Sequence, residues 1–383
     1  MKFFENNSKN IIFFFLIFFS LLIYSRSPCL FYDGRRDIGE LEIFYNYALR
    51  NNTFETLFFV FREAQYFDLW INITSFFTAK LSLNIFLSTV YFSLIVKFYL
   101  LIYIFYSNSD FLKSNLYKFI FASFVIYSSG ITPEVWLTAL HSKSFFGILS
   151  FIMIFQNFSK FTKIKFYIYR FAIVFNGLCS IYSCIVAPIY FIKFLQKKNK
   201  LNFFNFLYSF LPLIINIFIL FYYFFLNNLN KINRFEFILT KLENALYNNI
   251  VRPIFGGNIS KILYDLLNLL NLKIIVLIFL GLFACVFLLY LLRKKDNNLN
   301  LITSSFVMNI FFVLLGSLYS DFAGGRYAVL SSIIFLSIFL RLVQIEKISS
   351  LRFIFISLII TSLIVGLIEF KLFNLWIYLL SCA

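Results

Sequence analysis

The sequence predicts an all-α, polytopic integral membrane protein with roughly 10–12 membrane helices. Hydrophobic residues make up 61% of the 383-residue chain, aromatic residues make up 22%, and the mean hydropathy is +0.85. A soluble domain is nearer half apolar and could not cover so much hydrocarbon. The apolar residues form continuous runs, whereas a transmembrane β-barrel shows alternation with a period of two. Lipid therefore requires helices, and we predict one transmembrane domain over residues 1–383.

The first predicted membrane helix is Ile11–Tyr24, which follows the basic residues Lys2 and Lys9. A positively charged start before an apolar run is also the shape of a signal peptide. The next stretch, "SRSPC" at Ser25–Cys29, lacks the small residues of a cleavage site. We therefore predict an uncleaved first span rather than a removed leader.

Apolar runs of membrane-spanning length continue toward the C-terminus. Three of them reach the roughly 20 residues needed to cross a bilayer core, namely Asn84–Tyr106, Phe203–Leu226 and Leu272–Leu292. The other predicted spans are Tyr117–Gly130, Ser144–Phe158, Leu301–Tyr319, Tyr327–Leu340 and Phe353–Phe370, with Leu69–Leu83 as a further short or re-entrant helix.

The distribution of Lys and Arg predicts a cytoplasmic N-terminus. With that orientation, the inside segments hold 18 of the 34 basic residues but only four of the 17 acidic residues. Basic clusters flank Phe166–Phe194 on both ends, which favours two short helices broken near Asn176–Ser183 over one straight span. A polar break at membrane depth is tolerated where protein or a water-filled cavity surrounds it.

The same charge count excludes nucleic acid as a partner, because the positive charge is divided among short loops instead of forming a basic domain. The five cysteines are scattered and predict neither a zinc site nor a disulfide framework. A single histidine, His141, argues against a histidine-based metal site. The sequence establishes no cofactor, and a divalent metal ion, although possible, is supported by no residue pattern.

The predicted outside face collects most of the chemistry-bearing residues. Its two large loops are residues 25–83, with amphipathic or re-entrant segments, and residues 227–271. The first loop carries seven of the chain's 17 acidic residues. Acidic, imidazole and guanidinium groups thus converge on one aqueous side. The candidates there are Asp33, Asp37, Arg62, Glu63, Glu134, His141, Asp321 and Arg326.

Each main candidate has a structural alternative. Asp33 and Asp37 could have no role beyond pairing with neighbouring arginines in a solvated loop. Glu134 follows a proline and could complement a helix dipole. His141 could be an interfacial residue with its polar tip in water, and Arg326 could extend to the lipid headgroups. The three tryptophans, Trp70, Trp136 and Trp376, are predicted to lie in aromatic belts at the membrane boundaries.

Three stretches carry a family resemblance: "SSGITPEVWLTALHSKSFFGILSFIMI", "NGLCSIYSCIVAPIYFIKFLQKK" and "GGRYAVLSSIIFLSIFL". With a short first span and a long acidic outside loop, the chain resembles the GT-C superfamily of membrane glycosyltransferases. It is more narrowly similar to a poorly characterised bacterial family of GT-C-like proteins of surface-glycan assembly. The resemblance implies a GT-C-like fold and an acidic catalytic base in the first outside loop. The usual adjacent Asp-Glu pair is absent, so Asp33 and Asp37 both remain open as the catalytic residue.

The resemblance implies an inverting glycosyltransferase that moves a sugar from a polyprenyl-phosphate donor to a glycan or lipid acceptor. By the same resemblance, Arg326 would bind the donor phosphate, Glu134 would orient the acceptor, and Asp321, His141, Arg62 and Glu63 would contribute to substrate binding. We expect a multi-pass protein of the bacterial inner membrane that acts on the non-cytoplasmic face. A glycan polymerase of the O-antigen type and a non-enzymatic flippase or transporter of lipid-linked glycans are the alternatives.

Overall fold

The computed structural model describes residues 8–35, 41–61, 66–127, 135–159, 161–184, 186–226, 247–269, 281–282, 286–319 and 328–381. Within these ranges the chain is mostly helical, which agrees with the predicted all-α class. Its internal contacts form two compact units, and each is described by itself. The first unit comprises Met1–Ala122, Pro133–Ile232 and Leu372–Ala383, and the second comprises Ser123–Thr132 and Asn233–Lys371.

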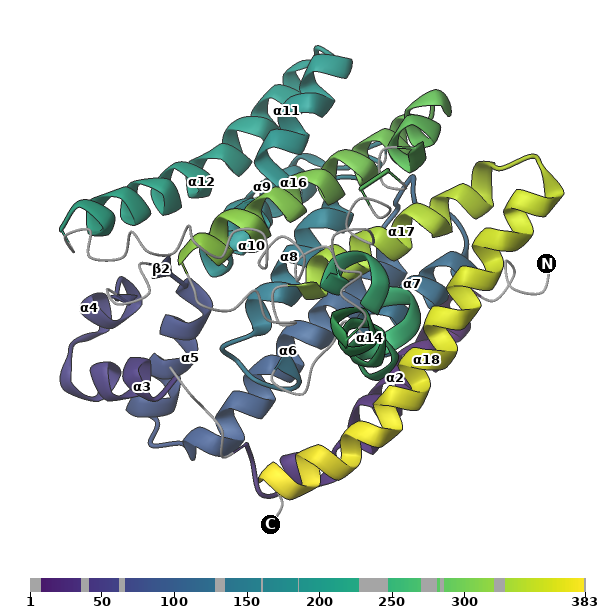
Figure 1. Cartoon of the computed structure of the whole chain (residues 1–383). Helices are drawn as coiled ribbons and strands as arrows, with labels where there is room; N and C mark the ends of the chain where they lie inside the picture. Colours follow the sequence, from purple (N-terminus) through teal and green to yellow (C-terminus); the bar gives the residue numbers. More distant parts are fainter. Residues whose placement is uncertain are drawn as a thin grey trace. The chain divides into compact units, whose positions relative to one another are not determined.

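The first unit contains most of the N-terminal elements shown in Figure 1. Helix α7 (Asn115–Tyr127) begins in this unit and ends in the second. The other elements are α2 (Ser8–Arg26), η1 (Pro28–Phe31), α3 (Leu41–Arg50), α4 (Thr53–Leu57), β1 (Val60–Phe61), β2 (Tyr66–Phe67), α5 (Leu69–Lys80), α6 (Ile85–Tyr106), α8 (Ser142–Met153), α9 (Lys163–Cys179), α10 (Ile181–Cys184), α11 (Val186–Gln196) and α12 (Lys200–Leu226).

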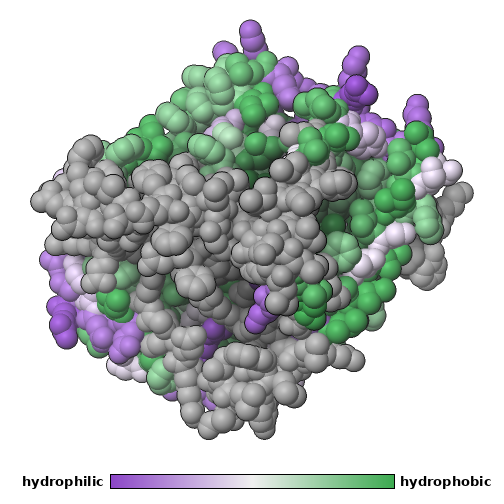
Figure 2. Space-filling view, viewed as in Figure 1, coloured by the Kyte–Doolittle hydropathy of each residue, from purple (hydrophilic) through white to green (hydrophobic). Residues whose placement is uncertain are grey.

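Four of the described helices contain segments long and apolar enough to cross a membrane. These segments are Lys9–Arg26, Ile85–Tyr106, Lys200–Tyr222 and Ser349–Glu369. Large apolar side chains are exposed on such helices, including Phe218 and Phe353. Figure 2 shows hydrophobic side chains over much of the coloured surface on one face. Exposed apolar surface on this scale marks contact with a lipid or protein partner rather than with water.

The predicted spans Ile11–Tyr24 and Asn84–Tyr106 coincide with α2 and α6 to within a few residues. The predicted break is also confirmed, because α9 ends at Cys179 and the extended Ser180 separates it from α10. Whether the chain returns to the same membrane side after this break stays a prediction. The predicted span Leu272–Leu292 lies mostly outside the described residues.

Helix α8 is shorter than the predicted span Ser144–Phe158, because it ends at Met153. Of its twelve residues, all but Lys143 are buried. A helix of this length covers only about 18 Å at 1.5 Å per residue and cannot cross a bilayer core alone. Helix α8 is therefore a core helix of the first unit, in contact with α6, α9 and α10.

The long loop at residues 25–83 folds on itself instead of remaining extended. Strands β1 and β2 pair antiparallel, with Val60 opposite Phe67. Helix α3 is amphipathic, as predicted, and lies beside α5. The buried side chains of the two helices and the hairpin form one apolar cluster, comprising Leu41, Phe44, Phe61, Ile71 and Leu140. Since Leu140 lies two residues before the first residue of α8, this cluster fixes the loop against the core helix.

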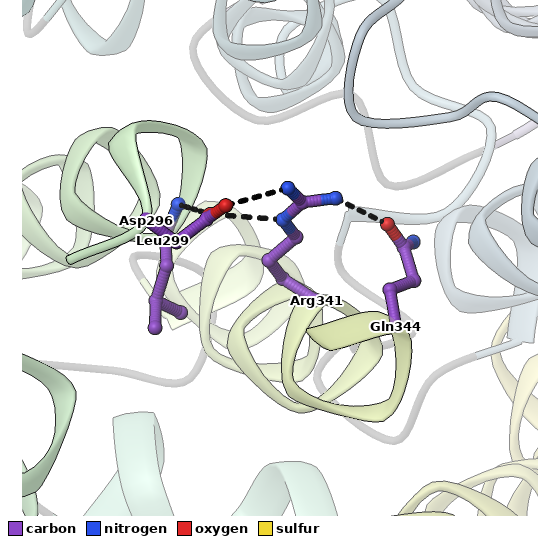
Figure 3. Close-up of polar contacts among 4 residues, drawn as sticks. All are labelled: Asp296, Leu299, Arg341 and Gln344. Atoms are coloured by element: carbon purple, nitrogen blue, oxygen red, sulfur yellow. Dashed lines mark hydrogen bonds and ion pairs between the residues drawn. The ribbon is translucent and has the colours of Figure 1, made fainter. Parts of the chain in front are cut away.

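The second unit consists of η4 (Tyr247–Val251), α14 (Arg252–Leu269), α16 (Asn297–Tyr319), α17 (Val329–Ile345) and α18 (Ser349–Ser381), whose residues from Leu372 belong to the first unit. The described part of the predicted loop 227–271 is thus helical. Asp296 caps α16 by accepting a hydrogen bond of 2.7 Å from Leu299 N. The same carboxylate accepts two hydrogen bonds, of 3.0 and 2.7 Å, from Arg341 of α17 (Figure 3).

Candidate functional site

Three cationic side chains of the first unit gather around one buried indole ring. Arg26 ends α2, Arg35 follows η1, and Lys97 lies in the middle of α6. The guanidinium carbon of Arg26 is 4.2 Å from the centroid of the Trp136 ring, and Lys97 Nζ is 5.1 Å from it. Arg35 donates a hydrogen bond to the backbone carbonyl of Trp136. All four side chains are at least 92% buried.

Among the described charged residues, Lys97 lies farthest from the ends of a candidate membrane span. Its side chain is fully buried. Its ammonium donates a hydrogen bond of 2.9 Å to Ser93 Oγ, one turn earlier, and lies 4.1 Å from the ring centroid of Phe145. A cation held in apolar surroundings by a hydroxyl and two aromatic faces marks a functional position by default.

The loop after η1 is docked on the start of α6 by a glycine. Gly34 has a φ of +77°, in the left-handed region that favours glycine. A Cβ at this position would lie 2.5 Å from the backbone carbonyl carbon of Phe86. The close approach allows Arg35 N to donate a hydrogen bond of 2.9 Å to Phe86 O. Gly34 thereby places Arg35 against the α6 backbone, where its side chain reaches Trp136.

The short segment before α8 carries Trp136 in a constrained conformation. Leu137 has a φ of +49°, which is unusual for a non-glycine residue. Ala139 N donates a hydrogen bond of 2.9 Å to Thr89 Oγ1 of α6. Together with the Arg35 contact, this bond fixes the segment to both α6 and the first loop. Strain held by surrounding contacts is typical of positions that preorganise a site.

The charge of this cluster, defined as Arg26, Arg35 and Lys97, favours an anion. The guanidinium groups of Arg26 and Arg35 stay protonated, and both lie within the same buried cluster. Gathering like charges out of water costs free energy, and a nearby negative group offsets that cost. Guanidinium groups bind phosphate and carboxylate oxygens through paired N–H donors, which makes the cluster suited to a phosphate.

A buried carboxyl group lies in the same first loop. Asp68 is 2% exposed and caps α5, since its Oδ1 accepts a hydrogen bond of 3.1 Å from Ile71 N. Burial raises the pKa of Asp68 to about 7, and it outweighs the opposing effects of the Lys143 ammonium and of two backbone N–H groups. A carboxyl that exchanges its proton near neutral pH is suited to general acid–base catalysis.

The first turn of α8 joins the carboxyl group to the cation cluster. Lys143 acts electrostatically on Asp68, and its Nζ lies 4.9 Å from the Tyr66 ring centroid. Two residues later, Phe145 covers Lys97. Ser180 holds this turn in place, because its Oγ donates a hydrogen bond of 2.6 Å to the Lys143 carbonyl. The break between α9 and α10 therefore supports the site.

The structure places only two of the eight predicted site residues. Asp33 is exposed, and its backbone N–H donates a hydrogen bond of 2.8 Å to Cys29 O. His141 is 6% exposed at the N-cap of α8, where its side chain makes no capping hydrogen bond. The other six, Asp37, Arg62, Glu63, Glu134, Asp321 and Arg326, lie outside the described residues.

Three sequence interpretations are corrected. Trp136 is fully buried against two cations and is not part of an aromatic belt. His141 is buried, which contradicts the alternative of a wet interfacial side chain. Cys29 is disulfide-bonded, although the cysteine pattern predicted no disulfide framework. Among the described residues, no group of three or more His, Cys, Asp or Glu side chains could hold a metal ion.

Sequence reasoning missed most of the side chains that the structure brings together. Lys97 is a lone charge within an apolar run, which is a signal of function, but it was not among the predicted site residues. Asp68 was visible as one of seven acids in the first loop, but only its burial distinguishes it from the others. Arg26, Arg35 and Trp136 carried no sequence signal beyond their positions near predicted span ends.

Comparison with family models, curated proteins and solved structures found no match for this chain.

Proposed function

We propose that the chain is a membrane glycosyltransferase that uses a sugar linked to a polyprenyl phosphate. The observation that carries the proposal is the buried cluster of Arg26, Arg35 and Lys97, joined through α8 to the near-neutral carboxyl of Asp68. A lipid-linked phosphate needs cations at the edge of a membrane-spanning helix, and a sugar transfer needs a proton acceptor beside them. The first unit contains both kinds of group, the buried cations and the carboxyl of Asp68.

In the proposed reaction, the Asp68 carboxylate takes the proton from an acceptor hydroxyl. The acceptor oxygen forms a bond to the anomeric carbon of the donor sugar from the face opposite the phosphate. The bond between the anomeric carbon and the phosphate oxygen breaks, and its electron pair leaves with the lipid phosphate. The cation cluster stabilises the negative charge that grows on that phosphate. Attack from the opposite face inverts the configuration.

Two further observations support an outward-facing site. The predicted loop orientation places residues 25–83 outside, on the Lys and Arg count. Cys29, in the same loop, is disulfide-bonded, and disulfides persist on the oxidising side of a bacterial inner membrane. The proposal therefore retains the inner membrane, a cytoplasmic N-terminus and a glycan or lipid acceptor outside the cytoplasm.

Among the candidate bases, Asp68 fits the proposal better than Asp33. A base must exchange a proton near the working pH and must be shielded from bulk water, whereas Asp33 is exposed. Asp37 remains the alternative base, and Arg326 remains a predicted phosphate ligand. The two rival functions are a glycan polymerase, which would join whole repeat units, and a flippase or transporter, which would deprotonate no acceptor.

The test is sugar transfer from a polyprenyl-phosphate donor by the purified protein in lipid nanodiscs. Arg35→Lys keeps the charge but loses the planar pair of donors, so it should raise the KM for the donor more than it changes the KM for the acceptor. Arg50→Lys is the matched control, since Arg50 is exposed in the same loop. Equal effects of the two substitutions would count against phosphate binding by the cluster. In sealed proteoliposomes, lipid-linked glycan that crosses the bilayer without any transfer would establish the flippase instead.

A further inference from the structure

A cavity of about 440 Å³ opens in the first unit where α6 and α8 end. It is separate from the cation cluster, which contacts the middle and the beginning of α6. Its lining combines aromatic, amide and cationic side chains from α6, from the turns after α6 and α8, and from the start of α9. The lining includes Tyr99, Tyr103, Tyr106, Gln156, Asn157 and Lys165.

One wall of the cavity is the last two turns of α6. Tyr99, Tyr103 and Tyr106 recur at helical spacing, which puts them on one face. Tyr99 is 40% exposed and Tyr106 is 59% exposed, so this face continues outward from the cavity. Because α6 is a candidate membrane span, lipid chains would lie along this face, and tyrosines at its end would lie at headgroup level.

The floor of the cavity is a fixed polar network centred on Gln156. Tyr103 OH donates a hydrogen bond of 3.1 Å to Gln156 Oε1, and Gln156 Nε2 donates to the carbonyls of Asn108 and Asn157. Asn157 Nδ2 donates in turn to Asp110 Oδ1 at 3.0 Å. Since these bonds satisfy the amides within the protein, the cavity is preformed and does not depend on a ligand for its shape.

The charge on the remaining side favours an anion. Lys165 lines the cavity in the first turn of α9, and the hydroxyl of Thr162 caps that helix by accepting a bond from Lys165 N. The positive end of the α9 dipole and the Lys165 ammonium therefore act on the same space. Asp110 accepts the bond from Asn157, and its carboxylate disfavours an anion on that side of the network.

We propose that this cavity binds the head group of an anionic phospholipid, with its phosphate at Lys165 and its acyl chains along the exposed face of α6. The occupant is a membrane lipid because the cavity joins a cationic, hydrogen-bonded pocket to the apolar surface of a candidate span. A soluble phosphate would use the lysine but would leave the tyrosine face uncovered. This inference needs a membrane-embedded protein but is independent of the glycosyltransferase proposal.

The test uses the full-length protein in a neutral detergent, with added phosphatidylglycerol as the probe. Native mass spectrometry measures lipid binding, and thermal unfolding measures the stabilisation that bound lipid provides. Phosphatidylglycerol should bind and raise the melting temperature, whereas phosphatidylcholine and inorganic phosphate should leave it unchanged. Lys165→Gln should weaken phosphatidylglycerol binding about fivefold, the factor that one lysine near an anionic lipid contributes.

Lys163→Gln is the matched control, because Lys163 lies in the same turn but does not line the cavity. It should bind lipid as the unsubstituted protein does, and Lys165→Arg should restore binding. Tyr106→Ala should weaken binding without changing the charge, which tests the lipid-facing wall. Equal losses in the Lys163 and Lys165 variants would overturn the proposal in favour of general surface charge. Stabilisation by inorganic phosphate alone would also overturn it.

Discussion

Gly34 supports the candidate site through its backbone conformation, and Gly34→Ala should release the first loop. The left-handed backbone, with φ at +77°, costs a non-glycine residue about 1–2 kcal/mol. The added Cβ would also lie 2.5 Å from Phe86 C and 2.7 Å from Leu87 N, which are backbone atoms of α6 and cannot rotate away. The loop must therefore move, and it loses the hydrogen bond from Arg35 N to Phe86 O, worth about 1 kcal/mol.

These contributions predict that Gly34→Ala destabilises the docked loop by roughly 2–3 kcal/mol, the sum of the two terms above. Hydrogen exchange at the amide of Arg35 should therefore accelerate by about 30- to 140-fold, since 1.4 kcal/mol corresponds to a factor of ten. Mass spectrometry of peptides that cover residues 28–35 measures this exchange in detergent or nanodiscs.

Gly281→Ala is the control, because nothing lies within 4 Å of a Cβ at that position. It lies in a helical stretch, where alanine is the better helix former, so it should leave exchange at Arg35 unchanged. If Gly34→Ala also left exchange at Arg35 unchanged, the loop would not be docked through Gly34. The structural basis of the cation cluster would then be wrong.

Three other substitutions test the packing and the electrostatics. Gly177→Ala would place a Cβ 2.4 Å from the Pro212 ring between α9 and α12, and such overpacking should lower the free energy of unfolding by about 1–3 kcal/mol, measured by thermal unfolding. Arg341→Lys loses the two-point contact with Asp296 and should lower the free energy of unfolding by about 1 kcal/mol in the same assay. An unchanged free energy of unfolding would mean that water replaces the contact at no cost. Asp68→Asn tests the raised pKa: because the folded protein disfavours the ionised carboxyl, Asp68 reduces stability progressively from about pH 4 to about pH 7. The stability of the Asn variant relative to the unsubstituted protein should therefore rise over that interval, and a difference independent of pH would contradict the pKa.

The sequence was sufficient to predict long helices such as α6, because their signal is local. A run such as Asn84–Tyr106 is long, apolar and begins with a capping residue, and α6 coincides with it closely. The break at Asn176–Ser183 was also predictable, from small and polar residues between basic clusters. The hairpin at Val60–Phe67 was not, because strands of two residues show no periodicity.

The candidate site was less predictable because it depends on contacts distant in sequence. Arg35 meets Trp136 across 101 residues, and no local pattern links them. The distinction between Asp68 and Asp33 is one of burial, which charge and spacing do not reveal. Lys97 was the exception, since a charge within an apolar run is conspicuous by itself.

The most direct test of the proposed function is the rate of sugar transfer as a function of pH, measured in nanodiscs with a polyprenyl-phosphate donor. The account predicts a rate that rises with pH through an apparent pKa of about 7, as Asp68 loses its proton. Asp68→Asn should lower the rate by about 10²–10⁴-fold with the protein still folded, because asparagine caps a helix as well as aspartate does. Asp33→Asn should transfer sugar normally. Full transfer by the Asp68 variant, or loss of transfer in the Asp33 variant alone, would contradict the account.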